Sequence, residues 1–85
     1  MTIRKALVTG GNRGIGKEVC RQFSAQGFQV YLGCRDLESG NETAREIQSN
    51  GEIVPVKLDV RNPDDISSVG SAVGSQLDVL LNNAG

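Results

Sequence analysis

The sequence predicts one α/β domain built on an open parallel sheet. Apolar runs and segments of helical pattern alternate along all 85 residues, which is typical of a parallel sheet with helical crossovers. A glycine-rich loop joins the first apolar run to the first helical segment and indicates the same class. The expected order is β-α-β-α-β-α-β, with short right-handed connections and helices on both faces of the sheet.

A strand and a helix are predicted at the start of the chain. Residues 5–10 (KALVTG) form a short apolar run that ends in glycine. The first helix should begin near Ile15, because Ile15, Val19 and Phe23 recur at helical spacing. Gly27 is expected to end this helix, since glycine readily takes the left-handed backbone conformation found after a helix C-terminus.

The second strand and second helix follow directly. Residues 28–33 (FQVYLG) alternate in the manner of a strand with two different faces. Asp36 can cap the next helix, which should run to about Ser49. Gly40 and Asn41 weaken that helix, because both residues have low helical propensity.

The rest of the chain predicts two strands and one helix. Residues 53–60 (IVPVKLDV) contain Pro55, and proline lacks the backbone donor that a central strand needs. The third strand should therefore lie at the sheet edge, which gives the strand order 3-2-1-4 of a Rossmann-like sheet. Asn62 can cap a third helix, with proline and two aspartates in its first turn. Residues 77–83 (LDVLLNN) form the fourth strand, whose apolar run is typical of burial on both faces.

The loop at residues 8–18 (VTGGNRGIGKE) fits a dinucleotide-binding pattern. Gly10 suits the tight turn after a strand, Gly14 the close approach of pyrophosphate, and Gly16 the packing of helix against strand. The following helix adds the positive end of its dipole. These features favour a site for a dinucleotide cofactor.

The same loop also fits a nucleoside triphosphate pattern. Gly11, Gly16 and Lys17 match GxxxxGK, and Asp59 could imitate the metal-holding aspartate of such proteins. That pattern needs Ser or Thr after the lysine to bind Mg²⁺, but Glu18 stands there. The dinucleotide interpretation is therefore preferred, and Lys17 is expected to be a solvated helix residue.

The end of the second strand indicates which dinucleotide is bound. An acid at this position accepts hydrogen bonds from the adenosine ribose of NAD, whereas an arginine accommodates the 2′-phosphate of NADP. Cys34 occupies the position of the acid and Arg35 follows it. Arg13, in the glycine loop, could reach the same phosphate. Asp36 is interpreted as the helix cap, so the predicted cofactor is NADP(H), with NAD(H) as the alternative.

Composition and charge restrict the classes of function. The net charge is only −1 and there is no basic stripe, so nothing favours a nucleic-acid or membrane partner. The chain also has no histidine, which makes a zinc site unlikely. Cys20 and Cys34 lack the spacing of metal ligands, and buried free thiols are expected. No apolar stretch is long enough to cross a bilayer, and no metal site is predicted. A cytoplasmic protein is expected.

Four segments together resemble the short-chain dehydrogenase/reductase family, most closely its NADP-preferring carbonyl-reductase-like members. They are TGGNRGIG (9–16), CRD (34–36), LDV (58–60) and NNAG (82–85), in matching order and spacing. The resemblance implies the following cofactor-binding residues: Gly10, Asn12, Arg13, Gly14, Ile15, Gly16, Arg35, Asp59, Val60, Asn82, Asn83 and Ala84.

The resemblance also implies individual roles for some of these residues. Asp59 would face the adenine amino group, with the Val60 backbone nearby. Asn83 and Ala84 would lie against the ribose, and Ile15 against the pyrophosphate. In addition, Thr9 together with Asn82 and Asn83 would tie the first and fourth strands together beneath the cofactor.

Family members carry a serine and a Tyr-xxx-Lys pair downstream of the NNAG motif. The one tyrosine of this chain, Tyr31, has no lysine four residues on. Residues 1–85 are therefore expected to be a truncated Rossmann domain, the cofactor-binding half of an oxidoreductase, without catalytic residues or activity of its own. In such a half the fourth strand is an exposed edge, which predicts self-association. The alternatives are a non-enzymatic interaction or dimerisation module and, less favoured, a nucleoside triphosphate binder.

Overall fold

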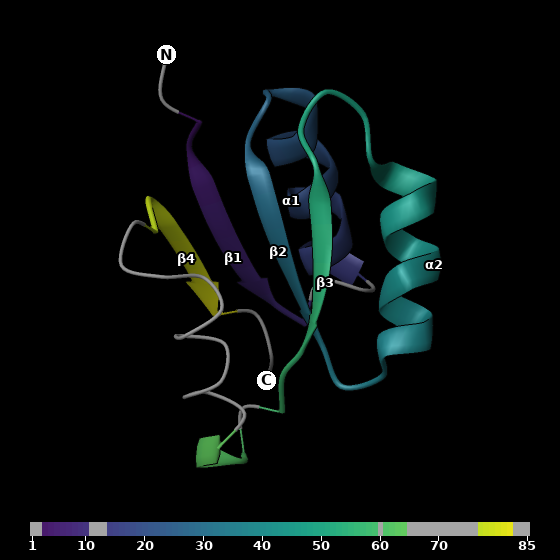
Figure 1. Cartoon of the computed structure of the whole chain (residues 1–85), viewed down its shortest axis with the longest axis vertical. Coiled ribbons are helices and arrows are strands. Elements are labelled where there is room, and N and C mark those ends of the chain that lie inside the picture. Colours follow the sequence, from purple (N-terminus) through teal and green to yellow (C-terminus); the bar gives the residue numbers. More distant parts are fainter. Residues whose placement is uncertain (1–2, 11–13, 60, 65–76, 83–85) are drawn as a thin grey trace.

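The computed structural model describes residues 3–10, 14–59, 61–64 and 77–82. Its core is a parallel four-stranded sheet in the order β3-β2-β1-β4, which confirms the predicted topology. The strands are β1 (Lys5–Thr9), β2 (Gln29–Cys34), β3 (Ile53–Lys57) and β4 (Val79–Asn82). The helices are α1 (Gly14–Ala25) and α2 (Leu37–Ile47). In Figure 1 the β1 and β4 arrows point downward, so the carboxyl ends of the parallel strands lie along the lower edge.

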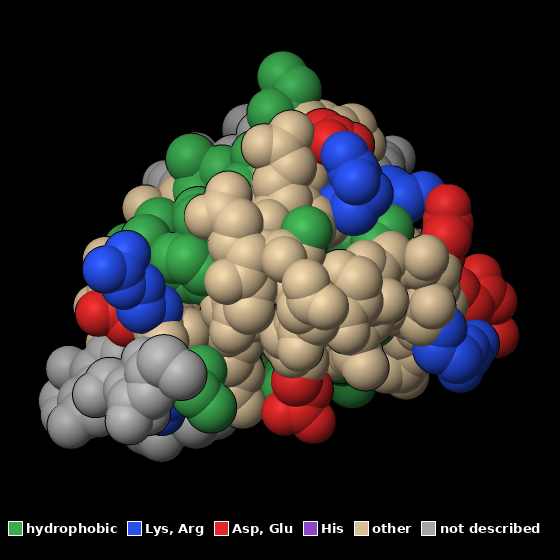
Figure 2. Space-filling model, turned by 90° about the horizontal axis from the view of Figure 1, so that it is seen from above, with side chains coloured by type: hydrophobic (Ala, Val, Ile, Leu, Met, Phe, Trp, Pro, Cys, Tyr) green, Lys and Arg blue, Asp and Glu red, His purple; other side chains and the backbone are tan. Residues whose placement is uncertain are grey.

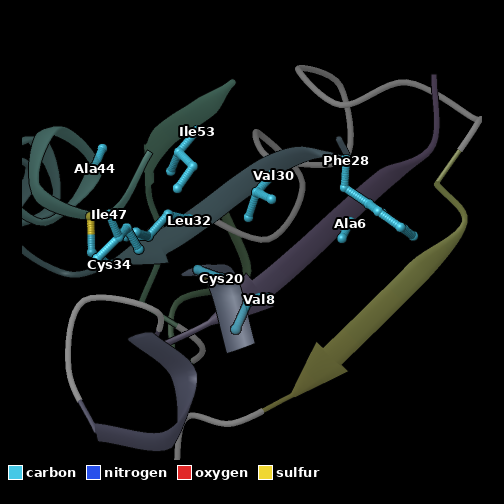
Figure 3. Packing of buried hydrophobic residues seen from close by; sticks show 10 residues of the cluster. All are labelled: Ala6, Val8, Cys20, Phe28, Val30, Leu32, Cys34, Ala44, Ile47 and Ile53. Carbon is cyan, nitrogen blue, oxygen red and sulfur yellow. The ribbon is translucent and has the colours of Figure 1, made fainter. Parts of the chain in front are cut away.

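Both described helices pack on one face of the sheet. The apolar side chains of this face form a single cluster, drawn in Figure 3, that joins both helices to β1, β2 and β3. Its buried members are Ala6, Val8, Cys20, Phe28, Val30, Leu32, Cys34, Ala44, Ile47 and Ile53. The opposite face has a smaller cluster around Leu7, Tyr31 and Leu58. The alternation predicted for the second strand is thus confirmed.

The C-terminus of α1 confirms the role predicted for Gly27. This glycine has φ +90°, and its N–H donates to Ser24 O at 3.0 Å. The N–H of Phe28 donates to Phe23 O, also at 3.0 Å. The two phenylalanine rings are 4.7 Å apart between centroids, which is the apolar contact that accompanies a Schellman end.

A buried serine ties α1 to the connection between α2 and β3. Ser24 Oγ donates to Gly51 O at 2.7 Å and accepts from Ser49 N–H at 2.9 Å, while Gly51 N–H donates to Ser24 O at 2.8 Å. A Cβ on Gly51 would lie 1.9 Å from the carbonyl oxygen of Phe28, so this position requires glycine. The sequence interpretation did not anticipate these bonds, because their partners are far apart along the chain.

The end of α2 differs from the prediction. The helix stops at Ile47 rather than near Ser49, because Gln48 turns extended with ψ 134°. The side chain of Gln48 then accepts a hydrogen bond from Ile53 N–H at 2.8 Å, which favours the earlier end. Gly40 is nevertheless accommodated within α2, since any larger side chain would collide with Cys34.

The second half of the chain is described in part. Asp64 N–H donates to Asn62 Oδ1 at 3.0 Å, as expected of a helix cap, but the remainder of the predicted third helix lies outside the described residues. The prediction that both faces of β4 are buried is wrong, because Leu80 is 63% exposed. Val79 and Leu81 pack on the face that carries both described helices, whereas Leu80 belongs to the opposite face, which neither of these helices covers.

Candidate functional site

The carboxyl ends of the parallel strands bring the described part of the predicted site, including Gly10, Gly14, Arg35 and Asp59, to one edge of the sheet. Gly10, directly after β1, has φ +64°, and Gly14, the first residue of α1, has φ +62°. L-residues with a side chain rarely adopt this conformation, so the structure requires glycine at both positions. A Cβ placed on Gly14 would meet no atom within 4 Å. The space beside Gly14 is therefore open to a ligand.

The first turn of α1 is suited to an anion. Gly16 is buried, as predicted for a glycine that lets the helix approach the strand, whereas Ile15 is 74% exposed beside the loop. The first turn contains no acidic residue, so nothing there offsets the positive end of the helix dipole. Asn12 and Arg13 lie outside the described residues.

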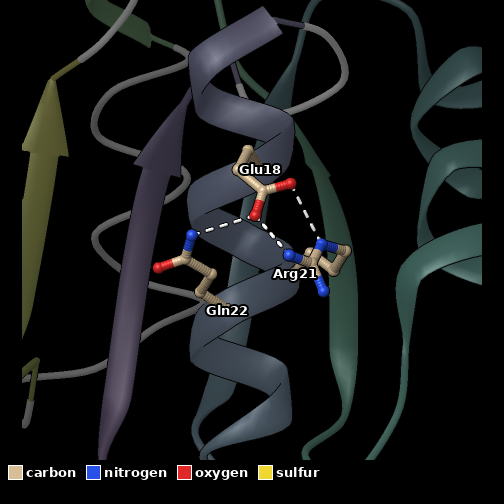
Figure 4. Close-up of polar contacts among 3 residues, drawn as sticks. All are labelled: Glu18, Arg21 and Gln22. Atoms are coloured by element: carbon tan, nitrogen blue, oxygen red, sulfur yellow. Dashed lines mark hydrogen bonds and ion pairs between the residues drawn. The ribbon is translucent and has the colours of Figure 1, made fainter.

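The charged residues of α1 weaken the triphosphate interpretation. Lys17 is not simply solvated as predicted, because its Nζ pairs with Glu46 Oε1 of α2 at 3.0 Å. Glu18 is bonded to the side chains of Arg21 and Gln22, as Figure 4 shows. The hydrogen bonds from Arg21 and then from Gln22 lower the pKa of Glu18 to about 2. Glu18 is therefore ionised at the position where a triphosphate loop has a metal-binding hydroxyl.

The connection from β2 to α2 presents Arg35 at the same edge. Asp36 has an extended backbone, and its Oδ1 accepts from Glu38 N–H at 3.1 Å. This confirms Asp36 as the cap of α2 and gives its carboxylate a partner within the helix. Arg35 is exposed, and Leu58 N–H donates to Cys34 O at 2.8 Å. The residues that follow Cys34 and Leu58 therefore lie on neighbouring chain segments.

Asp59, just beyond β3, is held by an arginine that the sequence interpretation did not select. The backbone N–H of Arg61 donates to Asp59 Oδ1 at 3.0 Å, and its Nε and Nη2 donate to Oδ1 and Oδ2, each at 3.2 Å. Hydrogen bonds from Arg61, followed by the charges of Arg61 and Arg35, hold the pKa of Asp59 below its usual range despite partial desolvation. A signal for this pair was present in the sequence, since Asp followed two residues later by a donor is the spacing of an Asx turn.

Thr9 connects β1 to β4 at the site. Its Oγ1 donates to Leu81 O at 3.4 Å, and its Cα is the register partner of Asn82. Thr9 therefore links β1 to β4 as predicted, through a hydrogen bond to the backbone of Leu81. The side chain of Asn82 lies outside the described residues, as do Val60, Asn83 and Ala84.

The described residues offer no alternative site of metal or thiol chemistry. They contain no cluster of His, Cys, Asp or Glu that could hold a metal ion. Cys20 and Cys34 are free and buried, and burial raises the pKa of both thiols, to about 12 for Cys20. Among these residues, no helix is long and apolar enough to cross a membrane. Figure 2, viewed from the amino ends of the strands, shows acidic and basic side chains interspersed.

Comparison with known proteins gives a family match over nearly the whole chain. The model of the short chain dehydrogenase family matches residues 4–85. Salutaridine reductase from Papaver somniferum is 44% identical over 96% of this chain. The (+)-neomenthol dehydrogenase of Arabidopsis thaliana is 42% identical over 99%. The chain spans 28% and 31% of the length of these two relatives.

Solved structures give the same result for the fold. A short chain dehydrogenase from Bacillus anthracis superimposes with a TM-score of 0.88 at 34% identity, over 96% of this chain and 35% of that one. Menthone neomenthol reductase from Mentha piperita gives 0.85 at 38% identity, over 100% and 32%. A metagenomic short-chain oxidoreductase in complex with NADP gives 0.83 at 38% identity, over 96% and 39%.

Proposed function

The chain belongs to the short chain dehydrogenase family, and on that premise we propose that it forms the NADP(H)-binding half of an oxidoreductase acting on carbonyl or alcohol groups. The observation that carries the proposal is the glycine loop. The backbone has a positive φ at both Gly10 and Gly14, which favours glycine, and a side chain at Gly14 would project into open space. Such a loop between a strand and a helix N-terminus suits the pyrophosphate of a dinucleotide.

The family neighbours support a nicotinamide dinucleotide. One solved relative holds NADP, and another, a short-chain dehydrogenase from Sphingobium yanoikuyae, holds NADPH. When bound, such a cofactor supplies or accepts the hydride. The role of the present residues is to bind and orient it.

Each part of the cofactor has a proposed partner at the carboxyl edge of the sheet. The loop with Gly10, Gly14, Ile15 and Gly16 receives the pyrophosphate, with Asn12 beside it. Arg35 and Arg13 receive the 2′-phosphate, which is chemically reasonable because arginine binds phosphate through charge-assisted bonds. Asp59 and the Val60 backbone receive the adenine, and Asn82, Asn83 and Ala84 receive the ribose.

The described residues hold no proton donor suited to the reaction. Tyr31 is 8% exposed and packs with Leu7 and Leu58 on the face opposite the two helices. We therefore propose that the described residues bind the cofactor and do not supply the proton for the reaction. The two curated relatives are more than three times as long as this chain.

The proposal is tested by calorimetric titration of the chain with NADPH and NADH. Arg35→Ala is compared with Arg45→Ala, a matched control on the exposed last turn of α2. We expect NADPH to bind more tightly by roughly tenfold or more, since a charged hydrogen bond contributes about 1.5–3 kcal/mol. Arg35→Ala should abolish the difference and Arg45→Ala should retain it. If neither NADPH nor NADH binds, the proposal is refuted.

A second role, self-association through β4, is favoured by one observation. Leu80 of this terminal strand is 63% exposed, and an apolar sheet edge readily pairs with another strand. We propose that two copies pair through β4 about a two-fold axis. Sedimentation should then show a concentration-dependent dimer that Leu80→Lys disrupts. A single monomeric species at high concentration would contradict this.

A further inference from the structure

We propose that Arg61 is a positioning residue that sets the preference for NADP(H) over NAD(H) by engaging the carboxylate of Asp59. With Arg61 in place, Asp59 neither captures Arg35 nor repels the 2′-phosphate that Arg35 binds. This inference rests on the proposed function and extends it to a residue outside the predicted binding set.

Arg61 and Asp59 lie in one turn and are joined by both backbone and side-chain hydrogen bonds. Asn62 N–H donates to Asp59 O at 2.8 Å and closes a turn. This turn directly follows Leu58, whose N–H donates to Cys34 O. Within that turn Arg61 uses its backbone N–H, Nε and Nη2 on one carboxylate. Three donors from a single residue fix the orientation of the Asp59 side chain, and the paired guanidinium balances its charge.

Arg35 lies within electrostatic reach of the same carboxylate. Neighbouring strands are about 4.8 Å apart, and the bond from Leu58 N–H to Cys34 O places Arg35 and Asp59 just beyond that contact. In agreement, the charge of Arg35 contributes to the lowered pKa of Asp59, after the larger contributions of Arg61. Asp59 thus lies within electrostatic range of both arginines, and Arg61 makes the hydrogen bonds.

Loss of Arg61 should therefore affect the two cofactors differently. Without the Arg61 guanidinium, the Asp59 carboxylate keeps the hydrogen bond from the backbone N–H of residue 61 but attracts the Arg35 guanidinium and repels a phosphate group more strongly. NADPH carries that phosphate and NADH does not, whereas both carry the adenine that Asp59 is proposed to contact. Arg61 is 74% exposed in its side chain, and an exposed ion pair adds little to folding stability, so variants at this position should remain folded.

The test is a set of binding constants for NADPH and NADH measured by calorimetry. Arg61→Gln should lower the NADPH-to-NADH preference by about fivefold, as expected for a partly exposed charge interaction. Arg61→Lys should retain part of the preference, because the charge remains. Arg21→Gln is the matched control, since Arg21 is also an exposed arginine bonded to a carboxylate, that of Glu18.

A double substitution distinguishes an effect of Arg61 through Asp59 from direct contact between Arg61 and the cofactor. Asp59→Asn combined with Arg61→Gln should restore the preference, because the carboxylate that captures Arg35 is gone. If the preference stays low in the double variant, Arg61 contacts the cofactor directly and the inference is wrong. Equal weakening of both cofactors by Arg61→Gln would show a structural role and also overturn it. If the unmodified chain has no NADPH preference, the NADP(H) assignment itself fails and this inference fails with it.

Discussion

Gly40 should be indispensable for the contact between α2 and the sheet, although it lies within a helix. A Cβ at this position would be 2.4 Å from Cys34 Sγ and 3.3 Å from the Pro55 side chain. Cys34 is 1% exposed, so its sulfur has little room to move. Gly40→Ala should therefore force α2 away from β2 and displace the short connection that carries Arg35.

The magnitude follows from two opposing effects. Alanine in place of glycine within a helix is favourable by about 0.5–1 kcal/mol, whereas overpacking a filled core costs about 1–3 kcal/mol. We expect a net loss of about 1–2 kcal/mol in the free energy of unfolding. In a domain of this size each kcal/mol lowers Tm by about 4–8 °C. Urea denaturation followed by circular dichroism measures the change directly.

Replacement of the colliding sulfur provides the decisive comparison. In a Cys34→Ala background, Gly40→Ala should be close to neutral, because the remaining neighbours of the added Cβ are the Pro55 side chain, at 3.3 Å, and the Cβ of residue 34, at 3.5 Å. Asn41→Ala, at an exposed position on the same helix, controls for helical propensity and should stabilise slightly. The reasoning is refuted if Gly40→Ala stabilises the unmodified chain, or if it costs the same with and without the Cys34 sulfur.

Three further predictions follow from buried or paired groups. Ser24→Ala should lower the free energy of unfolding by about 1–3 kcal/mol, because it removes the buried hydroxyl that bonds the backbone groups of Ser49 and Gly51; an unchanged urea midpoint would contradict the tie between α1 and the loop before β3. The Glu18 carboxyl should titrate near pH 2 by NMR, and Arg21→Ala should raise this pKa towards 4.5. Because the folded pKa of Glu18 is depressed, its stabilising effect should be complete above about pH 4.5 and disappear as the pH falls towards 2; a wild-type pKa near 4.5 would exclude the pair. Cys20 and Cys34 should resist thiol reagents at neutral pH until urea unfolds the chain, because burial raises the pKa of both thiols; rapid labelling of the folded chain would show that they are accessible.

The strand order and the helix caps could be predicted because they depend on local chemistry. Pro55 identified the edge strand, and Gly27 and Asp36 identified a helix end and a helix start. Proline lacks a backbone donor, glycine permits a positive φ, and aspartate accepts a capping hydrogen bond. Each residue type therefore indicates its local structure. The requirement for glycine at Gly10 and Gly14 was predictable for the same reason.

Other features could not be read from local patterns. The bonds of Ser24 reach residues 25 and 27 positions away, and the packing of Gly40 against Cys34 exists only once α2 folds onto the sheet. The exposure of Leu80 was missed because an apolar run does not show whether a helix covers each face of the strand. The contact of Arg61 with Asp59, in contrast, is local, and its Asx-turn spacing was present in the sequence but was overlooked.

The central claim is that a dinucleotide binds where the strands end, and amide NMR shifts recorded during an NADPH titration test it most directly. The account predicts that shifts are concentrated at Gly10, Gly14, Arg35 and Asp59, at the carboxyl edge of the sheet. Amides at the amino ends of the strands, such as those of Gln29 and Ile53, should remain unchanged. Saturable shifts centred on the amino ends, or no shifts at all, would contradict the account.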